Sequence, residues 1–406
     1  MSSKRQKYWI VSQVFYPNET STAFVMTKIA EQIIEIGEVH VICGSGHYHA
    51  DALKTTLSLD SRIVVHRINT PSWDKNNLFL RAVSFVIATL GLSWQILKKV
   101  NRRDTVILVT NPPTLIILTA IIKKIKGFRM FAILQDIFPE NLAVTGFIKV
   151  NSFFYRILLN IFNKAYRQAD HLIPCGEDMK DVFKEKVGSS MPISVITNWA
   201  DHEEIFPIEI DRNKYFGREL RGKIVLEFGG NIGRVQGLDR FLELFREINN
   251  PNLILLIIGD GAFKVRLQEM KSEYGLTSVI FMETKPRSEQ INFLNACDIG
   301  LVTLSEGMYG LGVPSKVYNI FSAGKPVLYI GDYHSEIYRY INEFDIGWAF
   351  TWNDSEEIIS FLNSLNVSFL TTIKERGRTA RMVVESKFTK NLILKQYNAV
   401  LNDKVI

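Results

Sequence analysis

The sequence predicts an α/β protein of two domains, each built on a parallel sheet whose strands alternate with helices. The chain has 406 residues, more than one hydrophobic core of ordinary size accommodates. Short runs rich in β-branched residues alternate with helical patterns along its whole length, which is typical of β–α–β units. The polar stretch 201–222 interrupts this alternation and indicates a domain boundary.

Apolar runs of strand length occur in both halves of the chain. A helix is expected at Thr22–Ile36, and the predicted strands around it in the first half are Tyr8–Phe15, Val39–Cys43, Arg62–Arg67, Thr105–Thr110, Met130–Gln135, His171–Pro174 and Ile193–Thr197. The predicted strands of the second half are Lys223–Phe228, Leu253–Ile258, Val279–Met282, Ile299–Leu304, Pro326–Ile330 and Gly347–Phe350. We therefore expect two Rossmann-like domains, residues 1–200 and 201–388, facing each other across a cleft, with ligands at the carboxyl ends of the strands.

The composition excludes several classes of protein. Hydrophobic residues make up 47% of the chain and charged residues 22%, as in an ordinary folded enzyme. The three cysteines are odd in number and form no C-x-x-C pair, which argues against a disulfide framework and fits a reducing compartment. The histidines show no H-x-x-x-H or H-E-x-x-H spacing, so no metal site is predicted.

Charge is distributed unevenly along the chain. Residues 1–200 carry a net charge of +9 and the remaining residues −3. The first domain is thus expected to face an anionic partner, either a membrane surface or a diphosphate-bearing acceptor. The basic residues are not interleaved with aromatic residues in a nucleic-acid-binding pattern, so no nucleic-acid partner is expected.

One uncharged stretch, Ala82–Leu97, is long enough to involve lipid. A bilayer-spanning helix needs about 20 apolar residues, so no transmembrane helix is expected here. Small and polar residues recur along it at helical spacing, and the rest of its surface is large and apolar. Either the helix is buried against the sheet, or its apolar side dips into a bilayer while Arg81, Lys98 and Lys99 meet anionic headgroups.

The segment 307–332 carries the strongest chemical pattern. Gly307, Gly310 and Gly312 lead through Pro314 into Ser315-Lys316 at a predicted helix start. Such a loop presents backbone N–H groups that suit a phosphate, and Lys316 adds a charge that can neutralise a departing diphosphate. The alternative is a tight loop with a helix cap.

A second glycine cluster, FGGNIGRVQGLDRF at 228–241, follows a predicted strand and precedes a helix. Gly230, Asn231 and Gly233 allow a ligand to approach the backbone, and Arg234 can grip a phosphate with two hydrogen bonds. The turn Gly259-Asp260-Gly261 ends another strand of the same domain, and it either lies near the nucleotide or is a plain turn.

In the first domain, QDIFPEN at 135–141 places two carboxylates at the end of a strand. Asp136 and Glu140 are candidates for contacting an acceptor hydroxyl or acting as general base. Alternatively, Asp136 caps a helix and Glu140 favours its positive end. Asn111-Pro112-Pro113 ends the preceding strand and is expected to wall the same cleft.

The segment Gly44–His49 mimics the start of a dinucleotide-binding fingerprint but follows the second strand, and His49 occupies the third glycine position. A dehydrogenase is therefore not predicted.

At these residues the chain resembles the retaining glycosyltransferases of family 4, which have the GT-B fold. More narrowly it resembles the bacterial branch that builds O-antigen, capsule and exopolysaccharide repeat units, including the N-acetyl-L-fucosamine transferases. The resemblance rests on segments in this order: SQVFYP, YPNETSTAF, NPPTL at 111–115, QDIFPEN, AYRQADHLIPCGEDM at 165–179, ITNWAD at 196–201, FGGNIGRVQGLD, LIIGDGAFK at 256–264 and VPSKVYNIFSAGKPV at 313–327.

The resemblance implies a nucleoside-diphosphate sugar, in particular a UDP-sugar, bound by the second domain. It implies a lipid-linked saccharide acceptor bound by the first domain, where Thr20, Ser21, Asn111 and Pro113 are candidate contacts. It also implies transfer with retention, no metal or other cofactor, and a C-terminal helix in residues 389–406 that crosses back to the first domain. The expected location is the cytoplasmic face of the plasma membrane, as a peripheral protein.

The chain departs from the family pattern at several positions. Leu311 and Asn319 stand where a Glu-x7-Glu pair is usual, and Gln236 stands near the place of a usual lysine. Thr20-Ser21-Thr22 replaces glycines of the first loop. The remaining donor machinery is then Lys316, Arg234, Ser315 and the loop amides, and Asn319 is predicted to hold the ribose in place of glutamate.

Two other functions are compatible with such a chain. The absent glutamates would suit a non-catalytic sugar-nucleotide-binding protein. A UDP-sugar 2-epimerase has a related two-domain fold, but it needs carboxylates and a histidine and has no reason for a basic, apolar first domain.

Overall fold

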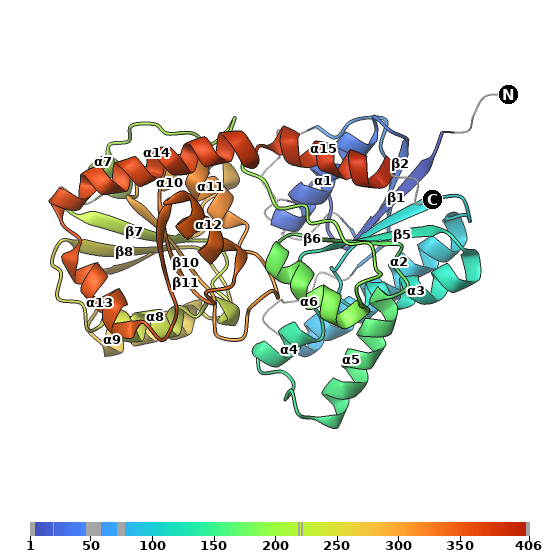
Figure 1. The fold of residues 1–406 in the computed structure, drawn as a ribbon, viewed down its shortest axis with the longest axis horizontal. Helices are drawn as coiled ribbons and strands as arrows, with labels where there is room; N and C mark the ends of the chain where they lie inside the picture. The colour runs from blue at the N-terminus through green and yellow to red at the C-terminus, as the bar shows by residue number, and fades with distance from the viewer. Residues whose placement is uncertain are drawn as a thin grey trace. The chain divides into compact units, whose positions relative to one another are not determined.

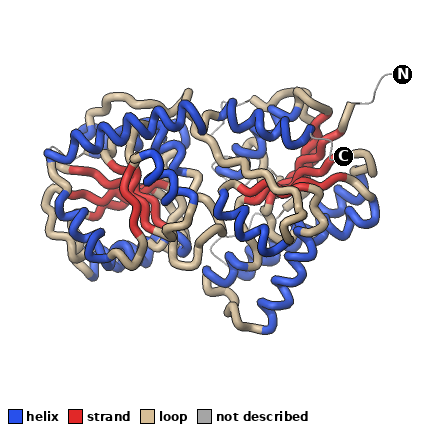
Figure 2. The backbone as a smooth tube through the Cα atoms, viewed as in Figure 1, coloured by secondary structure: helices blue, strands red, loops and turns tan. Residues whose placement is uncertain are grey.

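A computed structural model describes residues 5–18, 20–45, 58–70, 78–217, 220 and 222–402. The chain divides into two compact units, Met1–Thr197 with Ile393–Ile406, and Asn198–Leu392. Each unit contains one six-stranded parallel sheet with helices packed on it (Figures 1 and 2). The predicted α/β fold with two Rossmann-like domains is confirmed.

The first sheet has the strand order β3-β2-β1-β4-β5-β6. Its strands are β1 (Lys7–Ser12), β2 (Glu38–Cys43), β3 (Val64–Arg67), β4 (Thr105–Val109), β5 (Arg129–Leu134) and β6 (His171–Pro174). The helices of this unit are α1 (Ser21–Ile33), α2 (Leu78–Lys99), α3 (Leu115–Lys126), α4 (Glu140–Val144), α5 (Phe153–Tyr166) and α6 (Glu177–Val187).

The second sheet has the strand order β12-β11-β10-β7-β8-β9. Its strands are β7 (Ile224–Gly229), β8 (Leu253–Ile258), β9 (Val279–Met282), β10 (Ile299–Thr303), β11 (Val327–Ile330) and β12 (Gly347–Phe350). Its helices are α7 (Arg212–Phe216), α8 (Leu238–Phe245), α9 (Lys264–Glu273), α10 (Gln290–Asn295), α11 (Lys316–Ser322), α12 (Glu336–Phe344), α13 (Ser355–Ser364) and α14 (Leu370–Lys387), with short 3-10 turns at Arg234–Gln236, Arg287–Glu289 and Val367–Phe369.

Strand order determines where each unit can hold a ligand. In the first sheet, β2 and β3 follow on one side of β1, and the chain then crosses over to place β4 on the other side of β1. In the second sheet, β8 and β9 follow on one side of β7, and β10 lies on its other side. The crevice outside the carboxyl ends of two such strands is where open α/β sheets bind ligands. In the second unit that place lies between the loops after β7 and β10, which contain both predicted glycine clusters.

Six of the seven strands expected in the first half exist, but Ile193–Thr197 does not form a strand. This segment runs beside β6, where Leu172 N donates to Pro192 O and Ser194 N donates to Leu172 O. Only an isolated bridge joins Leu172 and Ile193. Ile196 N also donates to Pro174 O at 3.0 Å. Pro174 has no N–H to donate in return, so one bond of the ladder is missing and the segment does not form a regular strand.

The six strands expected in the second half all exist, with ends that differ by at most one residue. The side chains of β7, β8, β10 and β11 are almost all buried, on both faces of the sheet, so the sequence shows continuous apolar runs there and not an alternating pattern. One core cluster contains Leu226, Phe228 and Leu255, and a smaller cluster on other residues of the same strands contains Val225 and Leu256.

The last helix, α15 (Lys390–Asn402), follows α14 closely along the chain. From Ile393 onward it belongs to the first compact unit. Ile393, Leu394 and Tyr397 are buried, and the side chain of Asn398 donates to Glu35 at the end of α1. None of the helices in the described ranges is both long enough and apolar enough to cross a membrane.

Candidate active site

The loops after β7 and β8 are joined by backbone hydrogen bonds. Gly230 N donates to Ile258 O at 2.9 Å, Ile232 N to Asp260 O at 2.8 Å, and Phe263 N to Ile232 O at 3.1 Å. This contact requires glycines, because a Cβ on Gly259 would lie 1.9 Å from Gly230 O and one on Gly261 would lie 2.3 Å from Ile232 O. The turn at 259–261 therefore serves to fix the first glycine loop.

The loop after β7 is also tied to the end of β10. Ser305 N donates to Val235 O at 2.9 Å, Ser305 Oγ donates to Arg234 O at 3.0 Å, and the hydroxyl of Thr303 donates to Gln236 O. Gln236, which stands near the place of the usual lysine, accepts Gly233 N through its own side chain at 2.9 Å. Gln236 thus closes the loop on itself.

These bonds fix the backbone of Arg234 in the loop after β7, next to the loop after β8 and the end of β10. Its guanidinium lies 5.6 Å from the centre of the Phe263 ring, and the residue is exposed. No carboxylate in the described part of the chain forms an ion pair with it. An exposed guanidinium without a counter-charge is suited to a phosphate.

The loop before α11 offers several backbone donors. Gly312 N, Ser315 N and Lys316 N have no acceptor among the described residues, whereas Leu311 N donates to Met308 O at 3.1 Å. Ser315 is the N-cap residue of α11, and its hydroxyl makes no capping hydrogen bond. The backbone N–H of Leu311 is thus used in a turn, and a role of this residue in donor binding stays a prediction.

Lys316 and Glu227 form a buried pair of charged groups. Lys316 Nζ lies 3.2 Å from the centre of the Phe228 ring and is covered by protein. Neither Lys316 Nζ nor Glu227 Oε1 has a hydrogen-bond partner in the described residues. Burial lowers the pKa of Lys316 and raises the pKa of Glu227, and the charge of each partner opposes the other's shift.

Asn319 connects α11 to distant parts of its own unit. Its Oδ1 accepts Asp201 N at 3.0 Å, and its Nδ2 donates to Gln290 Oε1 at 3.2 Å. The residue is buried. Its Oδ1 can accept one more hydrogen bond and its Nδ2 can donate one more, so binding of the ribose by Asn319 stays a prediction. The sequence did not predict the structural role that these two bonds show.

In the first unit, Asp136 lies just after β5. Thr110 Oγ1 accepts its backbone N–H at 3.3 Å, and its carboxyl group accepts Asn141 Nδ2 at 3.2 Å. Asp136 is exposed to solvent, yet the density of protein around its carboxyl group desolvates that group and raises its pKa to about 6, while the bond from Asn141 lowers it.

Three further predicted acceptor residues, Glu140, Asn111 and Thr20, have structural partners. Glu140 is the first residue of α4 and forms a partly buried ion pair with Lys186. Asn111 O accepts Gln13 N at 3.0 Å, which ties the loops after β1 and β4 together beside the half-buried Pro113. Thr20 caps α1 by accepting Ala23 N, and Ser21 is exposed in the first turn. Asp136 does not cap a helix, because α4 has Pro139 at its N-cap.

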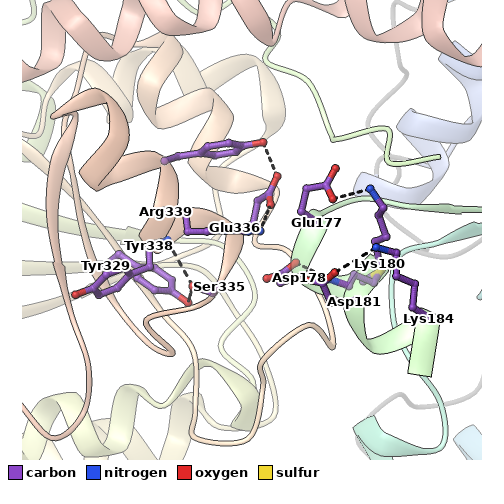
Figure 3. A network of polar contacts seen from close by, with 12 residues as sticks. Glu177, Asp178, Lys180, Asp181, Lys184, Tyr329, Ser335, Glu336, Tyr338 and Arg339 are labelled. Carbon is purple, nitrogen blue, oxygen red and sulfur yellow. Dashed lines mark hydrogen bonds and ion pairs between the residues drawn. The ribbon is translucent and has the colours of Figure 1, made fainter. Parts of the chain in front are cut away.

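Sequence reasoning missed two buried acids in the second unit. Glu227 could have been noticed as the one acidic residue inside an apolar strand, IVLEFG. Glu336 begins α12 after the end of β11 and is held by Arg339 and Tyr340, while Ser335 bonds Tyr329 and Tyr338 (Figure 3). The same figure shows Glu177 bonded to Lys180 in the first turn of α6, where no ligand role is needed to explain it.

Residues 46–49 of the Gly44–His49 segment lie outside the described residues. No three His, Cys, Asp or Glu side chains gather as a possible metal site in the ranges that the structure describes.

Comparisons with known proteins give a consistent result. Residues 211–366 match the family model described as glycosyl transferases group 1. The chain is 30% identical over 395 residues to "Probable glycosyltransferase WbjE" of Pseudomonas aeruginosa, covering 97% of both chains.

Among solved structures, the chain resembles Anabaena Alr3699/HepE in complex with UDP, with a TM-score of 0.72, 15% identity and coverage of 98% and 99% of the two chains. It also resembles WaaG, a glycosyltransferase involved in lipopolysaccharide biosynthesis, with a TM-score of 0.69, 13% identity and coverage of 97% and 100%. Identity this low shows a shared fold.

The close contact of Gly261 with Ile232 generates a stability prediction. Gly261→Ala should lower the free energy of unfolding by about 2 kcal/mol or more, because its φ of +157° is strained for alanine and the new methyl group meets a carbonyl oxygen. Gly275→Ala is the matched control: its φ is +64°, but nothing lies within 4 Å of the added Cβ. Urea unfolding should therefore show a smaller loss, about 1 kcal/mol, for the control. Equal losses would mean that the loops after β7 and β8 separate easily.

Proposed function

Because the chain belongs to the group 1 glycosyltransferases, we propose that it transfers a sugar, with retention of configuration, from a nucleoside-diphosphate sugar to a polyprenyl-diphosphate-linked saccharide. The observation that carries this proposal is the junction of the loops after β7, β8 and β10 in the second unit. There Arg234 and the free amides of the 312–316 segment lie at a strand-order reversal, where α/β sheets bind ligands.

The proposed donor is a UDP-sugar. HepE, which has the same fold, has been crystallised with UDP and with UDP-glucose. A diphosphate at this junction would meet the exposed guanidinium of Arg234 and the backbone donors of Gly312 and Ser315. A thermal-shift panel of UDP-, GDP- and TDP-sugars would identify the nucleotide, since only a bound ligand raises the melting temperature.

In the proposed reaction, the bond from the anomeric carbon of the donor sugar to the diphosphate oxygen breaks, and a bond to the acceptor oxygen forms. The diphosphate leaves with additional negative charge. Lys316 would turn from the Phe228 ring toward that charge, and Arg234 would hold the phosphates. The reaction as proposed needs no metal ion or other cofactor.

The proposed role of Glu227 is to position Lys316. A lysine buried without any counter-charge would lose its proton, because burial favours the neutral amine. Glu227 opposes that loss. Glu227 thereby increases the share of Lys316 that carries a proton when the diphosphate leaves.

In the first unit, Asp136 is proposed to contact the acceptor hydroxyl and to accept its proton. Asn141 orients the carboxyl group, and Thr110 fixes the backbone. Glu140 is a weaker candidate for the same role, because Lys186 already occupies one of its carboxylate oxygens. Thr20, Ser21, Asn111 and Pro113 stay proposed acceptor contacts.

The proposed biological role is synthesis of a surface polysaccharide, such as an O-antigen or exopolysaccharide, at the cytoplasmic face of the plasma membrane. WaaG, whose fold the chain shares, acts in lipopolysaccharide biosynthesis. The resemblance to N-acetyl-L-fucosamine transferases makes that sugar the first donor to assay. Turnover with any donor would exclude a non-catalytic binder, and release of free UDP with an epimerised sugar would indicate the 2-epimerase alternative.

The buried Lys316 generates the first functional prediction. Lys316→Ala should lower turnover about 10²–10³-fold, the usual effect of losing one preorganised charge contact, and Arg234→Ala should act in the same direction. Lys325→Ala is the control, because Lys325 is also buried in this unit but donates to Asn295 O, away from the loops. Folded Lys325→Ala protein should keep the turnover of the wild type. EDTA should change the turnover of neither the wild type nor this control. Near-normal turnover in Lys316→Ala would remove this residue from the mechanism.

The raised pKa of Asp136 generates a prediction about pH. The deprotonated carboxylate is the base, so kcat/KM for the acceptor should fall as the pH falls through about 6. Asp136→Asn should lower acceptor turnover, abolish this dependence and leave UDP affinity unchanged, because Asp136 lies in the first unit. A change in UDP affinity with unaltered acceptor kinetics would show that the two substrates are assigned to the wrong units.

Asn319 generates a prediction that separates two roles. Asn319→Ala should cost about 1–2 kcal/mol of unfolding free energy through the lost bonds to Asp201 and Gln290, and it should also weaken UDP binding if the amide holds the ribose. Asn295→Ala is the control, because Asn295 likewise bonds the backbone N–H of Ile208 but lies on α10. Calorimetric titration with UDP decides between the roles: loss of stability with unchanged UDP affinity would show that the ribose is held elsewhere.

A further inference from the structure

Helices α2, α3 and α5 form one layer of the first unit. α3 packs against both α2 and α5, and Figure 1 shows the three helices on the same side of the first sheet. Their inner faces are buried against the sheet or one another, as at Leu92, Ile116 and Phe162. Their outer faces have no cover in the described part of the chain.

The outer face of α2 is apolar. Leu90 is 58% exposed and Trp94 is 62% exposed, and Val86 and Leu97 lie on the same stripe at helical spacing. The small and polar residues Ala88, Thr89 and Ser93 are buried instead. The alternative that the apolar side of this helix is buried is therefore wrong for its described side chains, which exclude Phe79 and Arg81.

Helices α3 and α5 also expose apolar side chains. On α3, Ile121 and Ile125 are exposed one turn apart. At the start of α5, Phe153 is 73% exposed and Phe154 is 70% exposed. We name the apolar face as the set Val86, Ile87, Leu90, Trp94, Leu97, Ile121, Ile125, Phe147, Val150, Phe153, Phe154, Ile157 and Ile161.

This face gathers most of the exposed large hydrophobic side chains in the ranges that the structure describes, and the others are scattered, mainly over the second unit. Exposing so many apolar side chains on one layer of helices to water is unfavourable, which indicates that this layer is an interaction surface.

The charges on these helices have one sign. The sequences of α2, α3 and α5 contain no Asp or Glu. Exposed cations lie among the apolar residues, at Lys98, Lys124, Arg156 and Lys164, and Lys149 lies in the connection before α5. Apolar side chains interspersed with cations and free of acids match an anionic lipid surface, where tails accept the apolar groups and headgroups the cations.

We propose that the apolar face docks this protein on an anionic lipid bilayer, with the segment 147–154 as its aromatic anchor. Phe147, Phe153 and Phe154 can enter the acyl-chain boundary because each is already exposed. A second copy of the chain fits this face poorly. A two-fold interface would bring the same acid-free, basic helices together, and like charges would repel.

Vesicle flotation tests this proposal. The wild-type protein should bind vesicles of phosphatidylglycerol and phosphatidylethanolamine at low salt, and bind vesicles of phosphatidylcholine at least about tenfold less, since each basic residue near an anionic surface contributes roughly fivefold. The double variant Phe153→Ser with Phe154→Ser should reduce binding to the anionic vesicles by about tenfold or more. The matched control is Val265→Ser with Met382→Ser, because both residues are comparably exposed but lie on α9 and α14.

A second variant tests the electrostatic part. Charge reversal at Lys124, Lys149 and Lys164 should weaken binding at least about a hundredfold, and added salt should weaken the wild type in the same direction. These side chains are exposed, so the folded state should be kept, which the melting temperature checks.

Two results would overturn the proposal. One is a wild-type protein that does not float with anionic vesicles at low salt. The other is a dimer in solution that Phe153→Ser with Phe154→Ser dissociates, which would assign the face to a second copy. Flotation needs neither donor nor acceptor, so its outcome is independent of the proposed sugar transfer. A protein that binds vesicles but shows no turnover would contradict only the proposed sugar transfer. An active enzyme that never binds vesicles would contradict only the proposed docking.

Discussion

The candidate site depends on the close backbone contact between the loops that follow β7 and β8. Gly259 and Gly261 bring the second loop within hydrogen-bonding distance of Gly230 and Ile232, at a separation where no side chain fits. Ser305 then ties the first loop to the end of β10. Three strand ends are thereby held together, and Arg234 is carried on the resulting rigid loop.

The buried Lys316 and Glu227 add an electrostatic constraint to this frame. Placing two opposite charges inside a protein costs desolvation energy, which their mutual attraction offsets only in part. The arrangement persists although neither group is hydrogen-bonded within the described residues, as expected if it prepares a cation for an anionic ligand. Phe228 contributes its ring face to the ammonium, and its own side chain belongs to the core of the second unit.

The two units use their surfaces differently. The second unit keeps polar backbone groups free at one edge of its sheet, where a diphosphate can use them. The first unit presents an acid-free, apolar layer on α2, α3 and α5, which accounts for much of the excess positive charge in the first half of the chain. The proposed transfer, from a donor in water to an acceptor in a lipid surface, would use both kinds of surface.

The sequence by itself determined both sheets and the loops at their carboxyl ends. Strands buried on both faces require continuous apolar runs, and tight loops require glycine, so both leave a local pattern. It also singled out Lys316, Arg234 and Asp136 through their positions after strands. Only the tertiary structure decided that the buried Glu227 and Lys316 influence each other's charge and that Asn319 bonds Asp201, because such pairs are set by packing between distant segments. Packing likewise decided which side of α2 is covered: the helical period shows that two sides differ, but only the neighbouring α3 and the first sheet determine which of them meets water.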